Sequence, residues 1–406
     1  MIARFRPSVA RGTVDAPPSK SLAHRHLLAA ALSDAPSVVR GLCLSEDVLA
    51  TVDCAKSLGA EILFDGNDAI VRPHALPPSD LFPCRESGST LRFFLPAALL
   101  RETESLFTGS GRLFERPLGV YEDLCREKGL KFERKSDGIH VRGPLGSGKI
   151  RIRGDVSSQF VTGLLFALPL TDGDSELELI PPVVSRHYLR LTLSALRSSG
   201  IRIDEPAPFR FWIPGGQVYR AGDVRIEGDW SNAAVPEAFN LLGGQVIVRN
   251  LDPASEQGDR ACREIFPRFA MGEPIVDVAD IPDLAPILMA LGGALRGVTL
   301  TGTARLETKE SDRGRAMAEE LCKFGLRCET EEDRIRVHPA AKGLKTPGVP
   351  ADAHNDHRIA MACSLLLSLT GGELAGAECV KKSWPEFYEI LKALGIDVTL
   401  HDESGR

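Results

Sequence analysis

The sequence predicts a mixed α/β (α+β) protein built from six similar modules, and two observations lead to this fold class. A helix pattern that ends in glycine and continues into strand patterns recurs along the chain. Short Ser/Gly/basic clusters also precede apolar helix patterns between these modules. The glycines that end the helices are Gly59, Gly129, Gly200, Gly272, Gly325 and Gly395, spaced by 70, 71, 72, 53 and 70 residues.

The first module shows the pattern clearly. Its helix, Leu49–Leu58, ends at Gly59 and leads to strands at Ala60–Ile62 and Ala69–Val71. Glycine after a helix supplies the left-handed backbone conformation, and alternating apolar residues indicate strands. The order recurs at 124–141, 193–213, 264–276, 321–337 and 390–398, most weakly at 264–276. Modules of this length exceed solenoid repeats, so we expect two globular halves of three modules with a ligand between them.

Composition narrows the function classes. The 406 residues suffice for two or three domains, and the formal charge of 49 − 55 = −6 gives no global case for nucleic-acid binding. The longest apolar runs, 160–170 and 284–295, are too short to span a bilayer, and residues 1–12 lack a secretory apolar region. Nine cysteines without a CxxC pair indicate reduced thiols. We expect a cytoplasmic protein that binds neither nucleic acid nor membranes.

A local anion site is predicted at Ala16–Arg25. Pro17 and Pro18 keep the entry extended, and Ser19 or Ser21 can cap the helix that follows. Free N–H groups of a first helical turn, together with cations, attract anions. Each such cluster alone is more simply an ordinary helix cap. Together they place eight cations near helix starts, which indicates a cleft for several anionic groups: Lys20, Arg25, Arg92, Arg116, Lys309, Arg313, Arg358 and Lys382.

The motifs that could bind a cofactor or a metal are incomplete. Gly143–Lys149 is close to a P-loop, but Ile150 replaces the Ser/Thr that would bind Mg²⁺, and a strand pattern follows. No GxGxxG motif follows a strand. The two histidine pairs, His24/His26 and His354/His357, lack a third ligand nearby. We therefore expect no cofactor-binding and no metal-binding residues.

The ordered clusters resemble the 5-enolpyruvylshikimate-3-phosphate synthase family over nearly the whole chain. The most specific matches are Ser19–Arg25, Ser157–Gln159, Ile281–Asp283, Lys309–Arg313 and Asn355–Arg358. The resemblance implies a two-domain inside-out α/β barrel with six βαβαββ units in two halves of three. It places one discontinuous domain at 1–18 plus 228–406 and an inserted domain of three units at 19–227. It also implies an enzyme that works as a monomer on two small substrates.

The reaction implied by this resemblance is transfer of the enolpyruvyl group of phosphoenolpyruvate to the 5-hydroxyl of shikimate 3-phosphate, in chorismate biosynthesis. The implied catalytic residues are Lys20, Asp283 and Glu310. The implied contacts of shikimate 3-phosphate are Lys20, Ser21, Arg25, Ser157, Ser158, Gln159, Ser185, Tyr188, Asp283 and Lys309. Those of phosphoenolpyruvate are Lys20, Gly88, Arg116, Gln159, Arg313, Arg358 and Lys382.

Two alternatives share this pattern. UDP-N-acetylglucosamine enolpyruvyl transferase has the same architecture but uses a loop cysteine, and the comparable stretch Thr108–Glu115 has none. A catalytically inactive, anion-binding relative would not need Asp283, Glu310 and Lys20 together. The chain also departs from many relatives at Glu86, where they have asparagine. At Arg305 some relatives use an asparagine toward the shikimate phosphate, so we do not transfer that contact.

Overall fold

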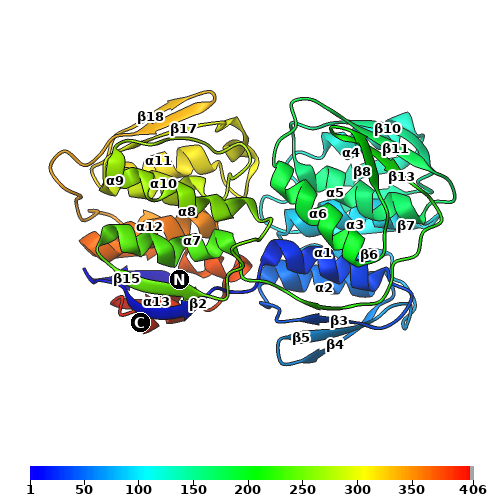
Figure 1. The fold of residues 1–406 in the computed structure, drawn as a ribbon, viewed down its shortest axis with the longest axis horizontal. Coiled ribbons are helices and arrows are strands. Elements are labelled where there is room, and N and C mark those ends of the chain that lie inside the picture. Colours follow the sequence, from blue (N-terminus) through cyan, green and yellow to red (C-terminus); the bar gives the residue numbers. More distant parts are fainter. Residues whose placement is uncertain (403–406) are drawn as a thin grey trace. The chain divides into compact units, whose positions relative to one another are not determined.

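The computed structural model describes residues 1–402 and divides into two compact units (Figure 1). The first unit comprises Met1–Pro17 and the chain from Gly228 onward, and the second is Pro18–Glu227. Pro18, which the sequence analysis placed with the first domain, groups with the second unit. At the two crossings, Asp229 N donates to Pro17 O at 2.7 Å within the first unit, and Ser19 N donates to Glu227 O at 2.8 Å within the second.

The second unit contains three four-stranded sheets of one design. In each sheet a parallel pair is extended by two antiparallel strands. The sheets are, in strand order, β14 (Asp223–Arg225), β3 (Ser37–Arg40), β5 (Asp68–Arg72) and β4 (Glu61–Asp65); β6 (Leu81–Pro83), β7 (Glu104–Thr108), β9 (Gly138–Arg142) and β8 (Lys131–Lys135); and β10 (Gly148–Arg153), β11 (Ser175–Ile180), β13 (Arg210–Ile213) and β12 (Asp204–Ala207).

The first unit repeats this design but draws strands from both ends of the chain. Its sheets are β20 (Ala351–Asp352), β21 (Gly372–Ala375), β1 (Ile2–Phe5) and β22 (Val398–His401); β16 (Ile275–Asp277), β17 (Val298–Thr301), β19 (Arg334–Val337) and β18 (Cys328–Glu331); and the pair β15 (Gln245–Arg249) and β2 (Arg11–Asp15). Strand β1 is antiparallel to both neighbours, and β2 runs parallel to β15.

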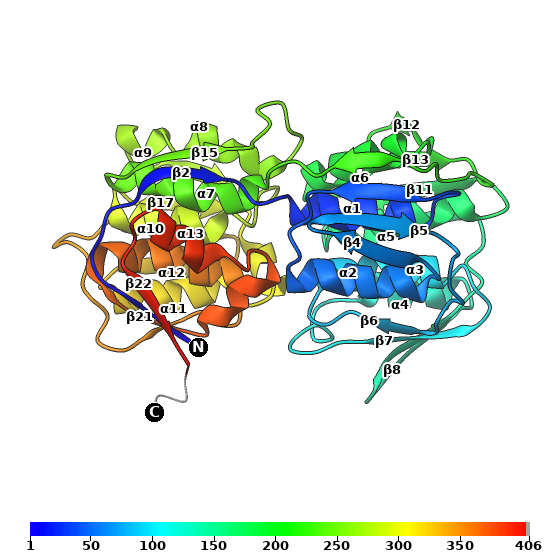
Figure 2. The same cartoon turned by 90° about the horizontal axis from the view of Figure 1, so that it is seen from below.

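Buried helices lie at the centre of each unit, with the strands around them (Figure 2). The second unit contains α1 (Lys20–Ala31), α2 (Glu46–Ser57), α3 (Gly88–Ala98), α4 (Gly119–Glu127), α5 (Ser158–Ala167), η1 (Leu168–Leu170) and α6 (Arg186–Ser198). The first contains α7 (Trp230–Phe239), η2 (Asn240–Leu242), η3 (Gly258–Ala261), α8 (Cys262–Ile265), α9 (Arg268–Met271), α10 (Ala285–Ala294), η4 (Ala304–Thr308), α11 (Arg313–Lys323), α12 (His357–Thr370), η5 (Ala377–Lys382) and α13 (Phe387–Ala393). In α5, α10 and α12 nearly every residue is buried, as expected for helices enclosed on all sides. Among the described residues no helix is both long and apolar enough to cross a membrane.

Five of the six predicted glycines end helices in the left-handed conformation, with φ between 67° and 98°. The residue after each one is buried, or partly buried in the case of Leu130, and its N–H returns to the helix, as Ile201 N does to Leu196 O at 3.0 Å and Ile396 N to Leu391 O at 3.0 Å. This arrangement is the Schellman motif. Because the motif uses the N–H of the residue after the glycine, the five strands that follow begin two to four residues after their glycines, later than the sequence predicted.

The helix of the module at Glu264–Val276 was predicted wrongly, whereas its strand is present as β16 (Ile275–Asp277). The expected single helix is split into α8 and α9, because Pro267 lacks the N–H that a continuous helix needs. Gly272 has φ 158° and ψ −153°, which is close to extended backbone. The strand that follows, β16, pairs in parallel with β17 and so begins the next sheet instead of closing a hairpin.

Candidate active site

In the second unit, the predicted anion site forms at the start of α1. Ser19 is its N-cap residue, although the Ser19 side chain makes no capping hydrogen bond. Lys20 Nζ donates to Asp47 Oδ2 at 2.8 Å, and both side chains are largely buried. Asp47 lies in the first turn of α2, whose N-cap Ser45 accepts from Val48 N. Lys20, which the sequence predicted as an anion-binding residue, therefore pairs with Asp47, which the sequence did not predict as part of the site.

Arg25 is buried one turn further along α1, where protein groups fix its guanidinium. Nε donates to Thr192 Oγ1 at 3.0 Å, Nη1 to Ser21 O at 2.6 Å and Nη2 to Tyr188 O at 3.1 Å. The guanidinium also lies over the rings of Phe93 and Tyr188. Burial lowers the pKa of Arg25 to about 10, partly offset by Tyr188. Arg25 thus joins α1 to α6 and remains charged at neutral pH.

A second pair of guanidinium groups lies against the first residue of α3. A Cβ added to Gly88 would lie 2.5 Å from Arg116 Nη1 and 2.8 Å from Arg92 Nη1. Arg92 is held by Gln159 Oε1 at 2.7 Å, and Gln159 Nε2 donates to Ser89 Oγ at 2.9 Å. Glycine lets the two guanidinium groups come this close to the backbone, and a side chain here would displace their ends.

The predicted serines lie at two further helix starts. Ser157 caps α5 and accepts from Gln159 N, so Ser158 and Gln159 occupy the first turn. Ser185 is the N-cap residue of α6 with φ 55°, a left-handed conformation that is uncommon outside glycine, and Tyr188 follows in the first turn. Hydrogen bonds of Arg25 and Arg92 join these helix starts to α1 and α3 within the second unit.

In the first unit, Arg313 is the centre of the predicted site. Its side chain is only 1% exposed, and its guanidinium bridges three carboxylates. Nη1 donates to Asp283 Oδ1 at 2.6 Å, Nη2 to Glu310 Oε2 at 2.7 Å and Nε to Asp356 Oδ2 at 2.8 Å. Asp356 is fully buried, caps α12 through Arg358 N and also accepts from Ser311 Oγ at 3.1 Å.

The charges around Asp283 set its ionisation. Burial would raise the pKa of this carboxyl, but Arg313, Lys309 and Arg358 together hold it well below its usual value. Lys309 Nζ lies 3.7 Å from Asp283 Oδ1 and Arg358 Nη2 lies 3.5 Å from Oδ2. Burial, with Arg305 and Arg313, lowers the pKa of Lys309 to about 8, although Asp283 and Glu310 oppose the shift. Asp283 is therefore ionised at neutral pH. Lys309 loses its proton at a lower pH than an ordinary lysine does.

Two more predicted cations are fixed near this cluster. Arg358, at the start of α12, donates from Nη1 to Asn232 Oδ1 at 2.9 Å, and Asn232 Oδ1 also accepts from Ser383 Oγ at 3.1 Å. Lys382 is 9% exposed and donates to Asn355 O at 2.7 Å. The four elements α7, α11, α12 and η5 therefore contribute to one charged cluster.

Sequence reasoning missed Asp47, Asp356 and Asn232 as partners of the predicted cations. The signal for Asp356 was its place directly before His357-Arg358, and for Asp47 it was the capping serine two residues earlier. In neither case does the sequence show which cation the carboxylate meets, because these contacts join residues 27 and 43 positions apart.

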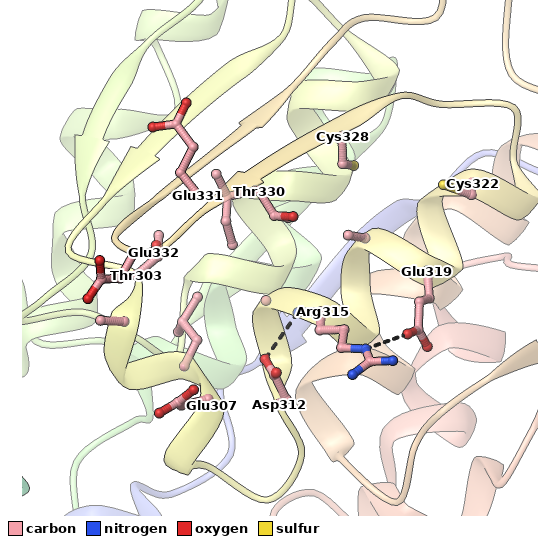
Figure 3. Close-up of a pocket in the computed structure, with 15 residues that line it drawn as sticks. Thr303, Glu307, Asp312, Arg315, Glu319, Cys322, Cys328, Thr330, Glu331 and Glu332 are labelled. Carbon is pink, nitrogen blue, oxygen red and sulfur yellow. Dashed lines mark hydrogen bonds and ion pairs between the residues drawn. The ribbon is translucent and has the colours of Figure 1, made fainter.

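A pocket of about 500 Å³ in the first unit contains none of the predicted site residues (Figure 3). It lies between η4, one face of α11 and the hairpin of β18 and β19. Asp312, Arg315 and Glu319 line it from α11 and its cap, whereas Arg313 on the same helix is buried against Asp283. The charged cluster and this pocket therefore lie on different faces of α11.

The chain matches the family model for EPSP synthase (3-phosphoshikimate 1-carboxyvinyltransferase) over residues 6–273 and 270–391. The chain belongs to the EPSP synthase family. Curated relatives named 3-phosphoshikimate 1-carboxyvinyltransferase include those of Clostridium kluyveri, 39% identical over 97% of each chain, and Clostridium botulinum strain Alaska E43, 36% identical over 97% of each chain. The solved EPSP synthase structure from Acinetobacter baumannii superposes with a TM-score of 0.75 at 22% identity, covering 98% of this chain and 99% of that one. The likeness confirms the predicted fold class, the two-domain inside-out α/β barrel of the EPSP synthase family.

Proposed function

We propose that the chain is a transferase that moves the enolpyruvyl group of phosphoenolpyruvate to the 5-hydroxyl of shikimate 3-phosphate and releases phosphate, within the biosynthesis of chorismate and the aromatic amino acids. Family membership supports this reaction. The observation that carries it in this chain is the trio formed by Asp283, Glu310 and Arg313, because it offers two carboxylates oriented by one buried cation.

The reaction needs two proton-transfer groups. The 5-hydroxyl attacks the central carbon of phosphoenolpyruvate and loses its proton, while the methylene carbon gains one. Phosphate then leaves, and the methyl group formed returns its extra proton, so the enolpyruvyl ether and phosphate are the products. We assign Asp283, which is ionised at neutral pH, to the hydroxyl proton. We assign Glu310 together with Lys20 to the methylene proton.

We assign the anionic groups of the two substrates to two sets of residues. A phosphate carries nearly two negative charges and each substrate also has a carboxylate, so each brings about three charges. Three of the five N–H donors of Arg25 are bound within the protein, and we assign the other two to shikimate 3-phosphate. The other proposed contacts of this substrate are Lys20, Ser21, Ser157, Ser158, Gln159, Ser185, Tyr188, Asp283 and Lys309. Those of phosphoenolpyruvate are Lys20, Gly88, Arg116, Gln159, Arg313, Arg358 and Lys382.

The chain offers a direct test of the proton assignment in Glu310→Gln. This variant should fold and bind both substrates but release phosphate at least about 100-fold more slowly, the usual effect of removing a positioned acid or base. Exchange of the methylene hydrogens of phosphoenolpyruvate with deuterated water should fall in parallel. Asp283→Asn should also lose turnover. The matched control is Glu307→Gln, since Glu307 is exposed on the pocket of Figure 3.

Three outcomes would contradict parts of this proposal. Near-normal turnover of Glu310→Gln would make this carboxylate a mere ion-pair partner of Arg313, with Lys20 as the acid. Phosphate release with UDP-N-acetylglucosamine in place of shikimate 3-phosphate would identify the sister enzyme. Binding of both substrates without turnover by the wild-type chain would identify an inactive relative. We further propose a cytoplasmic monomer that binds no nucleic acid, consistent with nine cysteines that form no disulfide among residues 1–402.

A further inference from the structure

A strained turn lies directly before the segment that carries Asp356 and Arg358. His354 and Asn355 have φ values of 50° and 52°, so two consecutive non-glycine residues adopt the left-handed conformation. Such residues persist where their surroundings fix them. The turn matters to the site because Asn355 O accepts from Lys382 Nζ at 2.7 Å and Asp356 binds Arg313.

A single carboxylate, Glu320, fixes the start of this turn. Its side chain is only 1% exposed, and the proposed reaction gives it no role. Oε1 accepts from His354 Nε2 at 2.8 Å, and Oε2 accepts from Asp352 N at 2.8 Å and lies 2.9 Å from Lys323 Nζ. Asp352 in turn accepts from His354 N at 2.7 Å. Glu320 therefore links α11 to the turn, directly through His354 and indirectly through Asp352 of β20.

We propose that Glu320 and His354 are positioning residues for the phosphoenolpyruvate contacts, because they hold the 354–355 turn in the conformation that presents Arg358 and Lys382. This inference rests on the proposed function. Neither residue touches the predicted substrate groups. Their effect reaches the site through the backbone of Asn355 and through the start of α12, which Asp356 caps.

The contact depends on charges that can be titrated. The hydrogen bond to Glu320 raises the pKa of His354, against the effect of burial and with help from Asp352 and Glu319. Burial would raise the pKa of Glu320, but His354, Lys323 and the Asp352 amide lower it. Cys363 on α12 also interacts electrostatically with Glu320. Burial raises the pKa of the Cys363 thiol and so keeps it neutral. The ion pair is therefore complete between the two shifted pKa values and weakens as pH rises through that of His354.

The test compares kinetics of the full-length chain with His354→Ala, His354→Gln and Glu320→Gln. His354→Ala and Glu320→Gln should raise the KM of phosphoenolpyruvate about tenfold and leave that of shikimate 3-phosphate nearly unchanged, the scale of one charge-assisted hydrogen bond. His354→Gln keeps an N–H donor that does not titrate. It should restore most of the affinity at pH 7 and remove the loss of phosphoenolpyruvate affinity at alkaline pH.

The matched control is His338→Gln, since His338 Nε2 also lies 3.0 Å from a carboxylate oxygen, that of Glu329, away from the turn. It should change neither KM. Equal increases in both KM values, or none, in the His354→Ala and Glu320→Gln variants of an active enzyme would overturn the inference alone. Wild-type alkaline behaviour in His354→Gln would do the same. A wild-type chain that neither turns over nor binds phosphoenolpyruvate by calorimetry would overturn the proposed function as well.

Discussion

Arg313 shows how one residue can organise a site. Its buried guanidinium faces three carboxylates, and the charges of Asp356, Glu310 and Asp283 raise its pKa well above the ordinary value despite burial. Arginine suits this place because its planar fork of donors can bind several oxygens at fixed angles. Removing it would leave buried carboxylates without their partner, which is far costlier than losing a surface ion pair.

Deprotonation of Lys309 should weaken the binding of shikimate 3-phosphate at alkaline pH. Its pKa of about 8 means that its positive charge disappears as pH rises through this value. We expect the KM of shikimate 3-phosphate to rise above pH 8, because the substrate then loses a cationic partner. Lys309→Arg should flatten this rise, since a guanidinium stays charged at these pH values.

A steady-state pH profile with each substrate varied separately measures this effect. The control is Lys392→Arg, because Lys392 is exposed on α13, so its profile should match the wild type. A Lys309→Arg profile identical to that of the wild type would assign the alkaline limb to another group.

At the scale of elements, helix starts carry most of the predicted site residues. The start of α3 is the tightest of them, because Ser87 caps the helix by accepting from Thr90 N and Gly88 lies directly against Arg92 and Arg116. Helix N-termini favour anions through their free N–H groups and the helix dipole. The glycine lets two guanidinium groups reach the same end of the helix.

Gly88→Ala should therefore act on one substrate. The added Cβ would force Arg116 to move, so we expect the KM of phosphoenolpyruvate to rise about tenfold while that of shikimate 3-phosphate stays within about twofold. Gly119→Ala is the matched control, because Gly119 is likewise the first residue of a helix and its added Cβ would meet no atom within 4 Å. Similar changes in both KM values for Gly88→Ala would show that α3 itself had shifted.

At the scale of the whole molecule, the two units differ in how they depend on the chain. All strands of the second unit's sheets lie between Ser37 and Arg225, within one continuous segment. The first unit needs β1 and β2 from the N-terminus, and β1 lies between β21 and β22. A missing central strand leaves backbone N–H and C=O groups unpaired along both neighbours.

We expect residues 18–227 to fold alone with a cooperative urea transition, and residues 228–406 alone to fail. Joining residues 1–17 to 228–406 through a short Gly/Ser linker should restore folding of the first unit, because Pro17 O and Asp229 N are only 2.7 Å apart. Far-UV circular dichroism and urea titration measure both results. A cooperative transition of residues 228–406 without the N-terminal strands would contradict this dependence.

The sequence by itself determined the repeated modules, five of the six helix-ending glycines and the cations at the helix starts. These features are local: a glycine at C′, a capping serine and an apolar period each act within a few residues of the chain. It erred at 264–276, where Pro267 outweighed the helical pattern, and in the strand starts, where Schellman turns take up further residues.

Only the tertiary structure decided which polar side chain each cation meets. Lys20 with Asp47, Arg313 with Asp356 and Arg358 with Asn232 are contacts between separate helices, and β1 joins the sheet of β21 and β22 across most of the chain length. The pKa values follow from the same contacts, since burial and neighbouring charges set those of Asp283 and Lys309. A sequence shows which groups can ionise, but their distances and their exposure to water are properties of the packed chain.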